Sequence, residues 1–158
     1  MYKRALVPLD GSPVAEAIVP FIVQIAGPLD MTVRLLAVVE PIQPTMVENA
    51  GSVMAQDLAT RTRYAEDYLA PIAAELRGRG VDADWEVRHG RPATTILAAA
   101  KSFRADLIAM STHGRGGLGR LLFGSVAEQV LRHADVPVFL MRHTEAQVAA
   151  RAAETMTR

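Results

Sequence analysis

The apolar positions of the chain follow two alternating patterns. Short continuous apolar runs are typical of parallel strands buried on both faces, whereas apolar residues three to four positions apart are typical of amphipathic helices. The runs predict four strands, at residues 4–9, 32–39, 106–110 and 136–141, and a weak alternation of apolar and polar residues predicts one more strand at residues 82–88. The helical spacing predicts four helices: one that opens at Ser12-Pro13 and stops at Gly27-Pro28, one from Met54 to Arg79-Gly80, one that opens at Gly90-Arg91-Pro92, and one that starts at Ser125. This alternation predicts an α/β fold, a parallel sheet with helices on both faces.

Particular residues predict where these helices begin or break. Ser12 is suited to the N-cap of the first helix, with Pro13 at its first helical position. Pro71 lies inside the second helix and predicts a kink or break, because proline removes a backbone donor and clashes with the preceding turn. Ser125 and Glu128 form the spacing of a capping box, so we expect Ser125 to be the N-cap of the fourth helix.

Length and hydropathy predict one domain and a tail. A chain of 158 residues fits a single domain, which we expect at residues 1–142, followed by a helical tail at residues 143–158 with a thin apolar stripe. The first ten residues contain only a short apolar run, which predicts no signal peptide. No apolar stretch approaches the roughly 20 residues of a membrane span. We therefore expect a cytoplasmic protein that does not bind membranes.

The charge and the cysteine content exclude several classes of function. The chain has 17 Lys and Arg, 17 Asp and Glu, and no Cys. A net charge of zero argues against a nucleic-acid partner, and the absence of Cys excludes thiol nucleophiles and cysteine-ligated metal clusters. The four His are scattered along the chain and predict no metal site. An anionic ligand would have to be held by local geometry.

A glycine-rich stretch offers that geometry. Residues 110–125 (MSTHGRGGLGRLLFGS) contain five glycines and lie between an expected strand and an expected helix. Glycines let successive N–H groups turn toward an anion, and a helix N-terminus adds partial positive charge, so the combination favours a phosphate. The G-x-G-x-x-G at residues 114–119 lacks the acid that should end the next strand, and the G-x-x-x-x-G-S at residues 119–125 lacks the lysine of a P-loop.

The same stretch resembles the G-x2-G-x9-G-(S/T) pattern of nucleotide-binding members of the universal stress protein family. Gly114 matches the second glycine and Gly124-Ser125 ends the pattern, while Ser111 replaces the first glycine. The resemblance extends to VPLDGSPVAEAI, VRHGRPATTIL and GSVAEQVLRHADVPVFLMR, about residues 3 to 142. It implies a Rossmann-like sheet of the adenine nucleotide alpha hydrolase type with strand order 3-2-1-4-5. It also implies a homodimer, paired through the fifth strand.

The resemblance further implies a binding site for ATP, with Mg²⁺ carried by the nucleotide. It assigns Asp10 to the ribose, the backbone of Val38 to the adenine edge, and the glycine-rich loop to the phosphates. Ser111 could crowd the ribose or hydrogen-bond it. The nucleotide-binding residues that it implies are Pro8, Leu9, Asp10, Val38, Ser111, Gly114, Arg115, Arg120, Gly124, Ser125 and Val126.

Simpler interpretations exist for several of these residues. Asp10 next to Gly11 is also a common turn former, and Arg115 and Arg120 could be solvated loop charges. His113 has a suitable reference pKa for acid–base work, but no nucleophile or paired carboxylate lies near it in the sequence, so we predict no catalytic residue.

We therefore expect an ATP-binding dimer with a regulatory role in the stress response. Two alternatives stay open. One is a slow ATP hydrolase or phosphotransferase that uses the same site. The other is a family member without nucleotide binding that acts as a dimeric interaction module, which the replacement at Ser111 favours.

Overall fold

A five-stranded parallel sheet forms the centre of the computed structural model, which describes residues 2–41, 50–113 and 124–157. The elements are, in chain order, β1 (Arg4–Pro8), α1 (Pro13–Glu16), α2 (Val19–Ala26), β2 (Thr32–Val39), α3 (Ala50–Gly78), β3 (Asp82–His89), α4 (Pro92–Phe103), β4 (Leu107–His113), α5 (Ser125–His133), β5 (Val138–His143) and α6 (Glu145–Met156). The strand order is β3-β2-β1-β4-β5, which confirms the expected topology. Within the described ranges, no helix is both long and apolar enough to cross a membrane.

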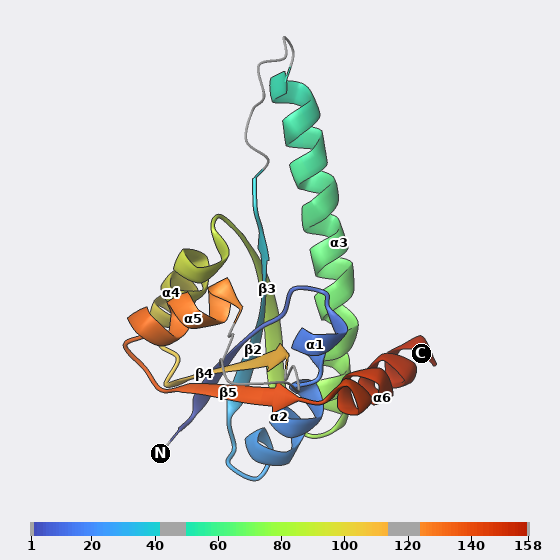
Figure 1. The fold of residues 1–158 in the computed structure, drawn as a ribbon, viewed down its shortest axis with the longest axis vertical. Coiled ribbons are helices and arrows are strands. Elements are labelled where there is room, and N and C mark those ends of the chain that lie inside the picture. The colour runs from blue at the N-terminus through green and yellow to red at the C-terminus, as the bar shows by residue number, and fades with distance from the viewer. Residues whose placement is uncertain (1, 42–49, 114–123, 158) are drawn as a thin grey trace, which may run out of the picture.

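Two apolar layers hold the helices on the sheet. Ala5 and Val7 of β1 face a core formed with α2 and α3, whereas Leu6 between them faces a second core formed with α4 and α5. Figure 1 shows the same division, with α4 and α5 on one side of the strands and α2 and α3 on the other. Because successive side chains of a strand point to opposite faces, the continuous apolar run of β1 supplies both layers.

The single helix predicted after Ser12 is wrong, because the segment forms two helices. Ser12 does cap α1: its Oγ accepts a hydrogen bond from the Ala15 N–H at 3.1 Å. The helix then ends at Glu16, and α2 starts at Val19 with Pro20 in its first turn. Pro20 has no N–H to donate to the Glu16 carbonyl, so a continuous helix would lose that bond, and the chain turns instead. As a result α1 is a separate one-turn helix that directly follows Asp10 and Gly11.

The predicted break at Pro71 is also wrong. The helix α3 runs without interruption from Ala50 to Gly78 and contains Pro71. Both Pro71 and Asp67, whose carbonyl loses its helical donor, lie at exposed positions, so water can hydrate that carbonyl. The amino-terminal part of α3 extends beyond the body of the domain in Figure 1.

The last two strands extend further along the chain than the apolar runs predict. β4 and β5 pair in register from Ile108↔Val138 to His113↔His143. Thr144 then caps α6, because its hydroxyl accepts from the Gln147 N–H while the Gln147 side chain accepts from the Thr144 N–H. The helix therefore starts directly after β5 and packs beside α1 and α3 (Figure 1).

Candidate functional site

The order of the strands reverses between β1 and β4, and this is where doubly wound sheets bind ligands. β1 and β4 pair only near their amino ends, through Ala5↔Leu107 and Leu6↔Ile108 among the described residues. β4 continues its pairing with β5 for several residues more. The carboxyl ends of β1 and β4 are therefore not joined to each other by ladder pairs, and their backbone groups face the reversal point.

The turn after β1 holds Asp10 at this edge. The Leu9 N–H donates to the Leu36 carbonyl at 2.8 Å, which keeps the end of β1 aligned with β2. Asp10 Oδ1 then accepts from the Ser12 N–H at 2.9 Å, and Gly11 adopts a left-handed φ of +82° that favours glycine. Asp10 thus has the turn-forming role that its sequence context suggests. The turn uses the Oδ1 atom of Asp10, and Asp10 Oδ2 accepts no hydrogen bond from the described residues.

The neighbouring strand β2 ends further along than β1 does. The β1–β2 register stops at Pro8↔Leu36, whereas β2 continues to Val39. The Leu36 carbonyl faces β1 and the Val39 carbonyl faces β3, where it accepts from the Gly90 N–H at 3.1 Å. Because backbone groups of successive strand residues point to opposite sides, Val38 presents its N–H and C=O toward the β1 side, beyond the last β1 pair.

On β4, the hydroxyl of Ser111 is a buried polar group with no hydrogen-bond partner in the described part of the chain. The residue lies opposite Met141 of β5, and its Oγ is buried with no hydrogen-bond partner among the described residues. A buried hydroxyl left unsatisfied costs about 1–3 kcal/mol, so each such group calls for an explanation. Its position beside the reversal point makes a bound ligand one suitable partner.

The helix that faces this edge begins differently from the prediction. Gly124, not Ser125, is the N-cap of α5, and no side chain of the described residues caps the helix, so the predicted capping box is wrong. Glu128 is unavailable for the reciprocal bond because its carboxylate pairs with Arg132 one turn later, at 2.7 Å. The Ser125 side chain is therefore not used as a cap.

An uncapped helix start leaves donors available. In α5 the first bond within the turn runs from the Glu128 N–H to the Gly124 carbonyl, at 3.0 Å. The N–H groups of the three preceding residues have no partner inside the helix. A Cβ built on Gly124 would meet no atom of the described residues within 4 Å, so they leave the backbone there open to close approach. Val126 packs with the core that α4 and α5 share.

Three of the predicted site residues belong to a segment outside the described residues. Gly114, Arg115 and Arg120 lie in residues 114–123, outside the described residues. The structure does bring together the ends of β1, β2 and β4 and the start of α5, which carry Pro8, Leu9, Asp10, Val38, Ser111, Gly124, Ser125 and Val126.

Tyr68 of α3 is a neighbour of this site that the sequence interpretation missed. Its hydroxyl is buried, and it lies beside the Glu16 carboxylate and the Asp10–Gly11 turn. Burial, followed by the negative charge of Glu16, raises the pKa of Tyr68 above its usual value, so the hydroxyl stays protonated. The available signal was a polar-tipped aromatic residue within the apolar stripe of a helix, since such hydroxyls usually require a polar neighbour.

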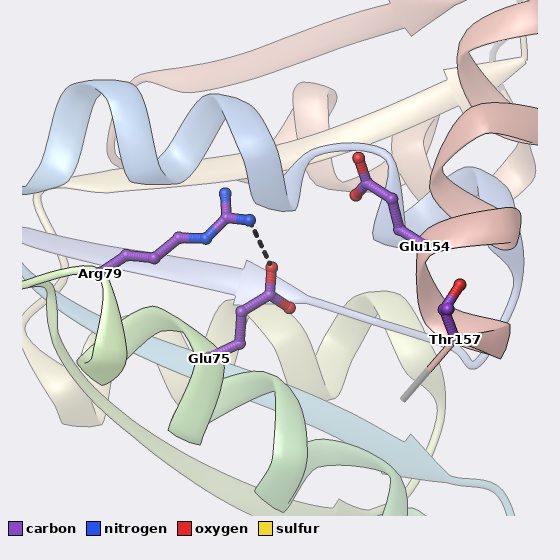
Figure 2. A pocket seen from close by; sticks show the side chains of 4 residues that line it. All are labelled: Glu75, Arg79, Glu154 and Thr157. Carbon is purple, nitrogen blue, oxygen red and sulfur yellow. Dashed lines mark ion pairs between the residues drawn. The ribbon is translucent and has the colours of Figure 1, made fainter.

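Two hollows lined by described residues lie away from this edge. One, of about 370 Å³, is lined by Glu75, Arg79, Glu154 and Thr157, between α3 and α6. Figure 2 shows these four side chains around it. The other, of about 310 Å³, is apolar and includes Tyr2, Leu29 and Phe139. In the described part of the chain, no group of three or more His, Asp or Glu is arranged to hold a metal ion.

The strand order and the polar groups at its reversal point define a Rossmann-like α/β protein. Residues 1–142 match the sequence model of the Universal stress protein family, and the chain belongs to that family. A universal stress protein of Methanocaldococcus jannaschii is 33% identical over 144 residues, which cover 90% of this chain and 83% of that protein. A longer universal stress protein of Mycobacterium tuberculosis is 35% identical over 145 residues, which cover 90% of this chain but only 46% of the relative.

Solved structures agree with this assignment. The universal stress protein UspA from Lactobacillus plantarum superposes with a TM-score of 0.77 and 26% identity, covering 89% of this chain and 98% of that one. Two more distant structures show the same fold. One is a universal stress protein in complex with cAMP (TM-score 0.58, 21% identity, covering 89% and 97%). The other is an Arabidopsis thaliana family member with AMP bound (TM-score 0.62, 15% identity, covering 91% and 94%).

Proposed function

We propose that the chain binds an adenine nucleotide, ATP in particular, at the carboxyl ends of β1, β2 and β4. The observation that carries the proposal is the buried Ser111 hydroxyl, which lacks a partner among the described residues and lies on a strand next to the reversal point. A hydroxyl of the bound ribose would satisfy it. The solved family members described with AMP and with cAMP support the same class of ligand.

The described residues offer a partner for each part of such a ligand. In the proposed complex, Asp10 Oδ2 accepts a hydrogen bond from the ribose, and the backbone of Val38 meets the adenine edge. The uncapped N–H groups at the start of α5, with the hydroxyl of Ser125, bind phosphate, because a helix N-terminus is a favourable place for an anion. Gly114, Arg115 and Arg120 complete the phosphate contacts in the proposal.

Mg²⁺ enters the proposal as part of the nucleotide. Magnesium in nucleotide sites commonly keeps several waters and binds phosphate oxygens with one or two carboxylates. Asp10 is a carboxylate at this edge, and the described residues provide no cluster of metal ligands. The ion would therefore depend on the triphosphate for most of its coordination.

We further propose a cytoplasmic homodimer with a regulatory role in the stress response. β5 lies at one edge of the sheet, and its residues Val138–Met141 are apolar and only partly buried. An open strand edge of this kind is a ready surface for pairing with another strand, here the β5 of a second copy. Sedimentation velocity should then show a species of twice the 17.1 kDa chain mass. A monomer at tens of micromolar would contradict the dimer.

The binding proposal is tested by titrating the purified chain with AMP and with ATP in a calorimeter. We expect saturable binding of both, and tighter binding of ATP in the presence of Mg²⁺. Asp10→Asn keeps the Oδ1 acceptor that forms the turn but removes the negative charge. Since a hydrogen bond to a charged group contributes about 1.5–3 kcal/mol, this variant should weaken binding by about tenfold or more.

Asp135→Asn is the matched control. Asp135 is an exposed carboxylate that pairs with Lys101 at 3.4 Å, between α5 and β5. The same chemical change there should leave affinity unaltered. The absence of saturable heat with either nucleotide, or an equal loss of affinity in the two variants, would refute the proposed site.

A further inference from the structure

The helix α6 lies outside residues 1–142, the part of the chain that matches the family model. It is nevertheless fastened to the domain by a buried cation. The side chain of Arg151 is only 2% exposed, and its Nη1 and Nη2 donate to Glu75 Oε1 and Oε2 of α3 at 3.1 and 3.0 Å. This is the paired geometry in which a guanidinium binds a carboxylate most strongly.

The same guanidinium also contacts α1, the short helix that directly follows the Asp10–Gly11 turn. Arg151 Nε lies 3.5 Å from Oε2 of Glu16, the last residue of α1. The hydroxyl of Thr155, one turn further along α6, has two acceptors within hydrogen-bond distance, the same Glu16 oxygen at 3.2 Å and the Arg151 carbonyl at 3.1 Å. Both Glu16 and Arg151 are buried, so Glu16 depends on α6 for much of its counter-charge and hydrogen bonding.

These contacts matter for α1 because it has only four residues. A single helical turn is not stable through its own hydrogen bonds and needs tertiary contacts. At its amino end, α1 continues directly into Ser12, Gly11 and Asp10, and the Ser12 N–H donates to Asp10 Oδ1. A shift of Glu16 would therefore be transmitted through one turn of helix to Asp10.

We propose that α6 positions the nucleotide-binding turn, with Arg151 and Thr155 as positioning residues that act through Glu16. The inference rests on the proposed adenine nucleotide site. If α6 favours the turn conformation that binds nucleotide, then nucleotide must in return favour the docked α6, because coupling between two equilibria is reciprocal. The tail is thereby a part of the protein that reports whether the site is occupied.

The surroundings of the contact would allow α6 to undock. The hollow of about 370 Å³ in Figure 2 separates α3 from the end of α6, with Glu75 and Arg79 on one side and Glu154 and Thr157 on the other. Glu75 Oε1 lies 3.6 Å from Nη2 of Arg79, whose side chain is half-exposed. Polar side chains such as these become hydrated when α3 and α6 separate, whereas an apolar interface would oppose the separation.

The test combines two variants that detach Glu16 from α6 with one that does not. Thr155→Val removes the hydroxyl donor, and Arg151→Met removes the cation while keeping a long apolar side chain. Glu154→Gln is the control, since Glu154 contacts the same guanidinium at 3.4 Å but is 59% exposed and is not part of α1. Each purified full-length variant is titrated with AMP, and amide hydrogen exchange is followed with and without AMP.

In the wild type, saturating AMP should slow exchange across residues 145–156. Thr155→Val and Arg151→Met should weaken AMP binding by about threefold to tenfold and speed exchange of the Ser12 and Ala15 amides without AMP. In Thr155→Val, which leaves the buried ion pairs of Arg151 in place, exchange in β2 should stay as in the wild type, whereas a general loss of stability would speed exchange there as well. Glu154→Gln should behave as the wild type in every measurement.

Two results would overturn the inference. One is α6 exchange that AMP leaves unchanged in a wild type that binds AMP. The other is wild-type exchange of Ser12 and Ala15 in both Thr155→Val and Arg151→Met. The second result is read without any ligand, so it judges the positioning role even if the wild type fails to bind AMP, an outcome that would refute the nucleotide site itself.

Discussion

At the scale of single residues, Tyr68 of α3 shows how a buried side chain packs against the turn after β1. Its buried hydroxyl lies beside Glu16 and Gly11, and its pKa is raised by burial and by the Glu16 charge. An ordinary tyrosine in the unfolded chain ionises near pH 10. The folded chain keeps this hydroxyl protonated at that pH, so its contribution to stability is complete below pH 10 and is lost as the pH rises further.

We therefore expect alkaline pH to destabilise the wild type more than Tyr68→Phe, which has no hydroxyl to ionise. By pH 11 the difference in unfolding free energy, relative to pH 8, should reach about 1 kcal/mol in favour of the variant. Urea unfolding of both proteins at the two pH values measures it. Parallel loss of stability in the two proteins would show that the Tyr68 pKa is not raised.

Ser125 offers a second test at this scale. The sequence predicts that Ser125 both caps α5 and binds phosphate, whereas in the structure it is not the cap. A serine N-cap contributes about 1 kcal/mol, but Ser125 is the first helical residue and caps nothing. Ser125→Ala should change the unfolding free energy by less than about 0.5 kcal/mol. It should still weaken ATP binding if the hydroxyl contacts phosphate.

Ser12→Ala is the matched comparison for that experiment. Ser12 does cap α1, since it accepts from the Ala15 N–H, so its loss should cost about 1 kcal/mol in urea unfolding. Equal destabilisation by the two substitutions would mean that Ser125 is a cap after all.

Local patterns predicted part of the site and missed the rest for a physical reason. Asp10 and Ser111 follow or end apolar runs, so their place at the carboxyl edge was predictable from chain order. Glu16 and Arg151 are buried together although 135 positions separate them, and each looks like an ordinary surface charge on its own helix. No periodicity in one segment reveals a partner in another.

At the scale of elements, α3 shows that a helix held by tertiary contacts can contain a proline. Leu69, Ile72 and Leu76 are fully or almost fully buried against the sheet, which keeps the segment helical around Pro71. Proline inside a helix is about 3 kcal/mol less favourable than alanine, although it also lowers the entropy of the unfolded chain.

Pro71→Ala should therefore raise the unfolding free energy by about 1–2 kcal/mol, measured in urea. Pro13→Ala is the control, because proline at the first position of α1 replaces an N–H that has no helical partner and should give no gain. A Pro71→Ala variant no more stable than the wild type would show that α3 does not pass regularly through that position.

The two errors at prolines have a common origin. Periodic apolar positions continued through both Pro20 and Pro71, yet the chain breaks before the first and not at the second. The outcome depends on what the helix packs against and on whether the freed carbonyl is exposed. Four of the five strands were easier to predict, because a continuous apolar run has few alternatives once both faces of a sheet are covered, whereas β3 showed only weak alternation.

At the scale of the whole molecule, the sheet order and the tail were predictable to different degrees. The alternation of strands and helices indicated a parallel α/β sheet, and the family resemblance supplied the order that the structure confirms. The attachment of α6 lies beyond the family match and follows from buried ion pairs with α1 and α3. The chain thus combines the family domain with a helix that packs against α1 and α3, next to the proposed nucleotide site.

The central claim is that the buried hydroxyl of Ser111 forms a hydrogen bond with the ribose of a bound nucleotide, and Ser111→Ala tests this claim most directly. Removing an unsatisfied buried hydroxyl should leave the unfolding free energy of the free protein unchanged or higher. Losing one neutral hydrogen bond to the ribose should weaken AMP binding about twofold to tenfold. A variant that is less stable than the wild type without ligand, yet binds AMP equally well, would contradict the account.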